Sequence, residues 1–100
     1  MQNINIEQTK FTPAVLLDCD QGLIEIRGDS LPENTIKFYQ PLMDGLDEYL
    51  KMPKEQTIVN LKLTYFNSSS SRFLFDLFDL LEAVSNDHKI VINWLYDEEN

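Results

Sequence analysis

A run of four serines at residues 68–71 is the part of the sequence best suited to phosphate chemistry. Asn67 precedes the run and Arg72 follows it, between a segment that predicts a strand and one that predicts a helix. Sites in open α/β sheets lie where strands end and helices begin, and the first turn of a helix offers N–H groups and a partial positive charge. A phosphate on one of these serines would add about −1.5 to −2 charges close to Arg72.

The same serines also fit a simpler structural role. Ser68 or Ser69 could cap the following helix with its hydroxyl, because serine is common at this position, and the other serines would then fill a polar loop. The residues alone leave both interpretations open.

Other reactive side chains do not form a catalytic set. The single His88 is expected in an exposed loop, and the serines lack the G-x-S-x-G turn of a serine hydrolase. Cys19 is expected as a small apolar residue at the end of a turn. One cysteine and one histidine cannot form a usual structural zinc site. The sequence therefore predicts a protein that is not an enzyme and holds no metal or cofactor.

Two sets of carboxylates have structural explanations. Residues 18–22 (DCDQG) resemble the start of a calcium loop, but Leu23 stands where such a loop needs glycine, so a turn is expected. Asp76, Asp79 and Glu82 recur at helical spacing and are expected on a solvated helix face. An acidic stripe that faces a partner is the alternative.

Composition limits the class of protein. The chain has 100 residues, of which 43% are hydrophobic, so a single folded domain over residues 1–100 is expected. Its formal net charge of −9 would repel nucleic acid and anionic membranes. No apolar run approaches the roughly twenty residues of a membrane span, and a single cysteine suits a reducing compartment. A cytoplasmic protein without nucleic-acid binding or membrane insertion is expected.

Hydrophobic periodicity predicts four strands and two helices in the order β-β-α-β-α-β. Pro13 marks the first strand as an edge strand, and the polar residues 1–8 are expected to be flexible. The predicted strands are residues 11–17, 23–27, 56–66 and 89–96, and the predicted helices are residues 31–51 and 72–85.

The start of the first helix carries a capping signal. Ser30 and Glu33 form a capping box, with Pro32 inside the first turn, so Ser30 is expected as the N-cap. The apolar face of this helix is predicted from helical spacing as Ile36, Tyr39, Leu42 or Met43, Leu46 and Leu50.

The strands alternate between apolar and polar residues, as expected for a sheet that is covered on one face. Right-handed crossovers then place both helices on that face. The fold class is therefore α/β, a two-layer sandwich with a mixed four-stranded sheet. The core face includes Val59, Leu61, Leu63 and Tyr65, and the open face includes Asn60, Lys62, Thr64 and Asn93.

Four segments in the same order resemble the SiaC-type bacterial regulatory phosphoproteins, whose fold is similar to that of anti-sigma-factor antagonists (STAS-like). The resemblance extends over residues 11–97, nearly the whole chain. The segments are residues 28–34 (GDSLPEN), 65–70 (YFNSSS), 76–82 (DLFDLLE) and 94–97 (WLYD).

The resemblance implies a phosphorylation switch. Its modified hydroxyl falls on Ser68, with Ser69 and Ser70 as further acceptors. A Ser/Thr protein kinase would add the phosphate and a PP2C-type phosphatase would remove it. The unphosphorylated form would bind and activate a GGDEF diguanylate cyclase, linking the switch to cyclic-di-GMP and biofilm formation. The residues implied in partner binding are Asp29, Ser30, Pro32, Glu33, Asn34, Asn67, Ser69, Ser70 and Arg72.

A small-ligand or lipid-binding module of the STAS/SEC14 type is the alternative function. Phe73, Phe75 and Phe78 give the second predicted helix a surplus of phenylalanine, which could line an apolar cavity. The competing interpretation assigns all three rings to the core.

Overall fold

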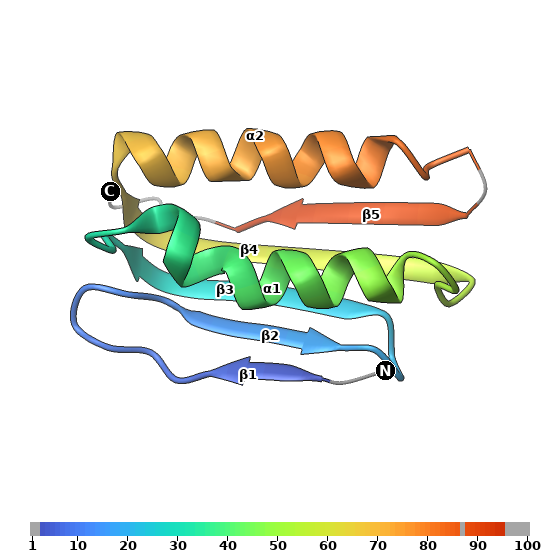
Figure 1. The fold of residues 1–100 in the computed structure, drawn as a ribbon, viewed down its shortest axis with the longest axis horizontal. Helices are drawn as coiled ribbons and strands as arrows, with labels where there is room; N and C mark the ends of the chain where they lie inside the picture. Colours follow the sequence, from blue (N-terminus) through green and yellow to red (C-terminus); the bar gives the residue numbers. More distant parts are fainter. Residues whose placement is uncertain (1–2, 87, 96–100) are drawn as a thin grey trace.

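The computed structural model of the chain describes residues 3–86 and 88–95. Within them, five strands and two helices form two layers (Figure 1). The elements are β1 (Ile4–Ile6), β2 (Ala14–Asp18), β3 (Leu23–Ser30), α1 (Thr35–Tyr49), β4 (Gln56–Phe66), α2 (Ser68–Glu82) and β5 (Lys89–Trp94).

The sheet is mixed, with the strands in the order β1-β2-β3-β4-β5. The pairs β1–β2 and β2–β3 are antiparallel, whereas β3–β4 and β4–β5 are parallel. Buried side chains of both helices and of one sheet face form a single core cluster. The predicted hairpin, the parallel pairing of the last three strands and the position of both helices on one face are thus confirmed.

The prediction of four strands was wrong, because β1 adds a fifth. It pairs with β2 and occupies the edge of the sheet, so β2 is an interior strand and Pro13 lies just before it. Ile4 and Ile6 pack against the core, although polar neighbours surround them in the sequence. Residues 1–8 therefore include an ordered strand, and a strand of three residues is too short to show clear alternation.

A β-bulge changes which face of β4 each side chain occupies near the end of the strand. Gly28 pairs with Leu63 but Asp29 pairs with Tyr65, so one residue of β4 is unpaired, and Gly28 has a φ of 112°. Because an extra residue reverses the alternation, Tyr65 turns away from the core and is 62% exposed. Its prediction as a core residue was wrong.

The helix starts differ from those predicted. Asn34, not Ser30, is the N-cap of α1, since its side chain accepts a hydrogen bond from the backbone N–H of Lys37. Ser30 belongs to the end of β3, and Pro32 precedes the helix. With this later start, Ile36 is 80% exposed instead of buried.

The second helix begins earlier than predicted, at Ser68 instead of Arg72, so the four serines form its first turn and not a loop. The last predicted strand is present as β5, which ends at Trp94, and Tyr96 lies outside the described residues. None of the helices in the described part of the chain combines the length and the apolar character that crossing a membrane requires.

Replacing Ile4 with alanine should destabilise the protein, because the Ile4 side chain lies between β1 and α1 near Gly45. We expect the free energy of unfolding to fall by about 1–2 kcal/mol for this half-buried side chain. Urea unfolding measures the loss. Asn5→Ala on the exposed side of the same strand is the matched control, and equal losses in the two variants would contradict a packed β1.

Candidate functional site

A buried cluster of hydroxyl groups joins the end of β3 to both helices. The Ser30 Oγ lies 2.6 Å from the Tyr39 hydroxyl of α1 and 2.8 Å from the Ser70 Oγ of α2. The Ser70 hydroxyl also donates to the Ser30 backbone carbonyl, at 3.0 Å. Since all three residues are buried, these hydrogen bonds replace those that water would otherwise provide. The cluster fixes the position of the first turn of α2 relative to α1.

Tyr39 also connects the two helices through its ring. The ring stacks on that of Phe73, with the centroids 3.7 Å apart and the planes within 5° of parallel. Burial raises the pKa of the Tyr39 hydroxyl to about 12, and the hydrogen bond with Ser30 opposes part of that rise. The hydroxyl is therefore neutral at physiological pH and acts as a hydrogen-bonding group.

Asn67 ends the strand and caps the helix. Its backbone N–H donates to the Ser30 carbonyl at 3.1 Å, and its side-chain oxygen accepts from the Ser70 backbone N–H at 2.9 Å. The Ser69 hydroxyl also donates to this oxygen and lies 2.6 Å from the Thr35 hydroxyl at the start of α1. The simpler interpretation, in which Ser68 or Ser69 caps α2, was therefore wrong.

The structure distinguishes the four serines from one another. Ser70 is 1% exposed and belongs to the buried cluster, whereas Ser69 is exposed but hydrogen-bonded to Asn67 and Thr35. Ser71 is half-buried. Ser68 is exposed, and within residues 3–86 and 88–95 its hydroxyl makes no hydrogen bond. The four hydroxyls therefore differ in exposure and in hydrogen bonding.

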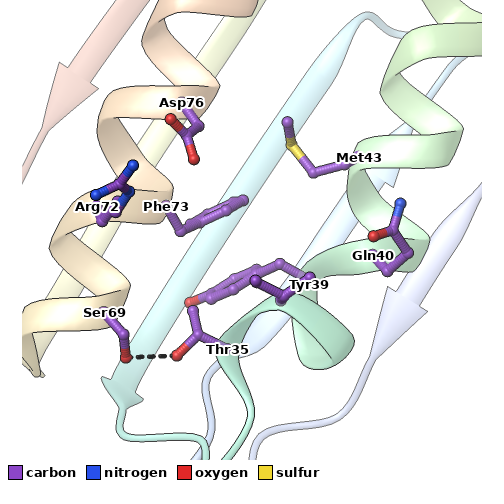
Figure 2. A pocket seen from close by; sticks show the side chains of 9 residues that line it. Thr35, Tyr39, Gln40, Met43, Ser69, Arg72, Phe73 and Asp76 are labelled. Atoms are coloured by element: carbon purple, nitrogen blue, oxygen red, sulfur yellow. Dashed lines mark hydrogen bonds between the residues drawn. The ribbon is translucent and has the colours of Figure 1, made fainter.

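Two depressions adjoin this first turn. A shallow hollow of about 360 Å³ is lined by Ser68, Ser71, Arg72, Phe75 and Asp76. A deeper groove of about 450 Å³ lies between α1 and α2, and Figure 2 shows the rings of Tyr39 and Phe73 between its walls. The hollow and the groove share Arg72 and Asp76. The lining of the groove is Thr35, Ile36, Tyr39, Gln40, Met43, Ser69, Arg72, Phe73 and Asp76.

The residues expected in partner binding divide into two groups. Ser30, Pro32 and Ser70 are buried, because the chain folds them beneath the junction. The exposed or half-buried members are Asp29, Glu33, Asn34, Asn67, Ser69 and Arg72.

The groove contains residues that the sequence reasoning did not select. Helical spacing predicts Ile36 on the buried face of α1, but it lines the groove together with Gln40 and Met43. Asn34 is a signal in the sequence for these residues, because asparagine is a common N-cap. A helix that begins after Asn34 is predicted to have Ile36 on its exposed face.

The three phenylalanines of α2 do not share one environment. Phe73 belongs to the core, Phe78 packs against its edge, and Phe75 is 65% exposed. The core interpretation holds for Phe73 and was wrong for Phe75. The outward position of Phe75 places it in the hollow beside Ser68.

The remaining candidates have structural roles, and two differ from expectation. Asp18 accepts hydrogen bonds from the backbone N–H groups of Asp20 and Gln21, which confirms the turn. Cys19 is buried in the core where the turn begins, not at its end as predicted, and burial raises the pKa of its thiol. His88 is half-buried rather than exposed, with its Nε2 lying 3.2 Å from the Thr57 hydroxyl. In the described part of the chain, His, Cys, Asp and Glu side chains do not gather in threes that could hold a metal ion.

Comparison with known proteins identifies the family to which this chain belongs. The model of the SiaC family regulatory phosphoproteins matches residues 6–100. The chain belongs to the SiaC family. This confirms the resemblance seen in the four sequence segments, which include the serine-rich junction.

Two proteins of Pseudomonas aeruginosa are similar to this chain, one in sequence and one in sequence and structure. An uncharacterized protein of Pseudomonas aeruginosa strain UCBPP-PA14, PA14_02130, is 32% identical over the whole chain, which spans 80% of that protein. Apo-SiaC from P. aeruginosa matches with a TM-score of 0.93 and 32% identity, over 100% of this chain and 84% of the other.

A second solved structure includes a partner. It is the crystal structure of the diguanylate cyclase SiaD in complex with its activator SiaC from P. aeruginosa. The match has a TM-score of 0.89 and 32% identity, over 97% of this chain and 80% of the other. Activation of a cyclase is thus a property of a relative with the same fold.

Tyr39→Phe should change the dependence of stability on alkaline pH. A folded-state pKa raised from 10 to about 12 contributes stability that is complete below pH 10 and is lost as the pH rises through 12. The wild-type protein should therefore lose stability over this range, and the variant should lose less. Urea unfolding at several pH values measures the difference.

At neutral pH the free energy of unfolding of Tyr39→Phe should be about 1 kcal/mol lower than that of the wild-type protein, because the hydrogen bond with Ser30 is gone. Tyr65→Phe, which alters an exposed tyrosine, is the matched control. Identical pH profiles for the wild type and Tyr39→Phe would contradict the buried, neutral hydroxyl.

Proposed function

We propose that this chain is a non-enzymatic signalling phosphoprotein of the cytoplasm whose phosphorylation at Ser68 switches its binding to a diguanylate cyclase. A Ser/Thr kinase adds the phosphate and a PP2C-type phosphatase removes it. The unmodified form binds the cyclase and raises cyclic-di-GMP synthesis, and biofilm formation follows from that output. The observation that carries the proposal is the exposed Ser68 hydroxyl at the first turn of α2, in a chain of the SiaC family.

The surroundings of Ser68 suit a phosphate. Ser70 and Ser71 donate their backbone N–H groups to Asn67, so the N–H groups of Ser68 and Ser69 are the ones that helix geometry leaves without a partner in the helix. The helix start stabilises an anion by about 0.3–1 kcal/mol. Arg72 lies four residues further on and lines the same hollow, a spacing at which side chains on one helix can interact.

A partner shaped around the neutral hydroxyl would meet a different surface after modification. Burying an uncompensated dianion costs several kcal/mol, and about 4 kcal/mol corresponds to a thousandfold loss of affinity. The modification acts by charge at the contact surface. The rest of the fold need not rearrange, because Ser68 takes no part in the buried hydroxyl cluster.

The burial of the other serines supports this choice of residue. A kinase would have to break the core to reach Ser70, and a phosphate on Ser69 would disrupt its hydrogen bonds with Asn67 and Thr35. Ser71 lines the same hollow as Ser68 but is half-buried. Ser68 is the serine that accepts a phosphate at the lowest structural cost.

Phosphorylation by a cognate Ser/Thr kinase should occur on Ser68, and mass spectrometry of the modified protein locates the phosphate. Ser68→Ala should abolish incorporation, whereas Ser71→Ala should leave it within about twofold, a difference well under 1 kcal/mol. Modification of Ser71 alone, or of neither residue, would contradict the assignment.

Binding to the diguanylate cyclase encoded nearest this chain should depend on the charge at residue 68. Ser68→Asp should weaken binding by at least about tenfold, because it places a carboxylate at the contact surface, while Ser68→Ala should keep most of the affinity. Calorimetric titration measures both, and cyclic-di-GMP synthesis should follow the same order.

Ser85→Asp provides the matched control for this titration, because it adds the same charge at an exposed serine beyond the other end of α2. It should bind the cyclase as the wild-type protein does. Equal affinities for Ser68→Asp and Ser68→Ala would remove the switch from the proposal.

A further inference from the structure

We infer that the kinase recognises Ser68 as part of a folded surface, the hollow beside the first turn of α2, in which Phe75 is its apolar contact and Asp76 its charged contact. The inference rests on the proposed function in one respect, namely that Ser68 is the phosphorylated residue. It goes further by naming the surface that the kinase binds and the chemistry of the kinase surface that covers it.

The sequence around Ser68 does not distinguish it from its neighbours. Asn67 is followed by four identical side chains at residues 68–71. An enzyme that bound this segment as an extended chain could shift by one residue and still meet a serine hydroxyl. Selection of one acceptor is a difference in free energy between competing complexes, and the linear sequence offers little such difference.

The fold supplies the difference, because residues 68–71 form the first turn of α2. Successive side chains of a helix point about 100° apart, so the four serines face different directions. Ser68 and Ser71 line the hollow, Ser69 lines the groove toward α1, and Ser70 is buried. In the hollow, Ser68 is exposed and Ser71 is half-buried, so a kinase that occupies the hollow meets the Ser68 hydroxyl.

Phe75 gives the hollow an apolar contact that the core does not use. Its side chain is 65% exposed, whereas Phe73 and Leu74, which precede it in the sequence, are buried in the core. Phe75 follows Ser68 by about two helical turns, so both side chains lie on one side of α2, and both line the hollow. A partner that buried this ring would gain about tenfold or more in affinity.

The hollow also carries one charge of each sign. Arg72 and Asp76 both line it, and within residues 3–86 and 88–95 neither forms an ion pair. Arg72 is one turn from Ser68, and Asp76 is one turn further along α2. The kinase surface that complements this arrangement is apolar over Phe75 and basic over Asp76.

Transfer of the phosphoryl group requires a free hydroxyl and a path for an anion. The Ser68 oxygen attacks the γ-phosphorus of a nucleoside triphosphate held by the kinase, and the bond from that phosphorus to the bridging oxygen breaks. The nucleoside diphosphate leaves, and the hydroxyl proton passes to a carboxylate of the kinase. Arg72 is the one cation among the residues that line the hollow, so it favours the approach of the anionic group.

Steady-state phosphorylation of the full chain by the purified cognate kinase tests the two contacts. Phe75→Ser should raise KM by about tenfold or more and leave kcat within about twofold, because the ring contributes equally to binding of the ground state and of the transition state. Asp76→Lys should raise KM by about fivefold, because it places a cation against the basic kinase surface.

Two variants outside the hollow are the matched controls. Met52→Ser removes an exposed apolar side chain beyond the end of α1, and Asp47→Lys makes the same charge change as Asp76→Lys at an exposed position of α1. Both should keep the KM of the wild-type chain. Thermal melting should show that Phe75→Ser is folded, since the ring lies outside the core.

A synthetic peptide of residues 62–80 tests whether the kinase requires the folded surface. The peptide contains all four serines and the other residues of the hollow, but its helical part has only about 13 residues and is marginally stable in isolation. The kinase should modify it with a kcat/KM at least about a hundredfold lower than that of the full chain. Mass spectrometry should find the phosphate spread over more than one serine.

An unchanged KM for Phe75→Ser or for Asp76→Lys would overturn the inference. It would also be overturned by a peptide that is modified at Ser68 alone and as fast as the full chain. These results would leave Ser68 as the phosphorylated residue, and therefore leave the proposed function intact. Absence of phosphate from Ser68 of the wild-type chain would instead contradict the proposed function, and the inference with it.

Discussion

The arrangement of the two helices depends on the end of β3, where Ser30 forms hydrogen bonds with residues of both helices. Its carbonyl accepts from the Asn67 backbone and from the Ser70 hydroxyl, and its own hydroxyl lies within hydrogen-bonding distance of Tyr39 and Ser70. A buried polar group without a partner would cost about 1–3 kcal/mol, so these groups must stay together. This requirement fixes where α2 begins and how it faces α1.

The candidate site lies next to this buried cluster. Ser70 and Tyr39 are held beneath it, while Ser68 and Arg72 are left at the surface with their polar groups available. A modification at such a place changes the charge of the surface without acting on the core. This arrangement suits a chain of the SiaC family of regulatory phosphoproteins.

Much of the fold could be predicted because it follows from local pattern. The alternation over residues 56–66 predicted β4 with its observed bounds, and the two crossovers predicted a parallel arrangement with both helices on one face. Errors arose where a local signal competed with a distant one. The Ser30 capping box is a sound local signal, but the Tyr39 and Ser70 hydroxyls hold Ser30 in the sheet. Ile4 and Ile6 joined the sheet because β2 offered a free edge, which their own neighbours in the sequence do not reveal.

The sequence by itself determined the class of the protein and the family, since both follow from residue types and their order. Only the tertiary structure decided which of the four serines is free, because that depends on hydrogen bonds from Ser30 and Thr35, which are about forty and thirty-four positions away in the chain. The groove also required the folded structure, because its walls are helices separated by a strand, and the outward position of Ile36 results from where α1 begins. Contacts between distant residues are set by packing, and periodicity carries information only about neighbours within a few turns.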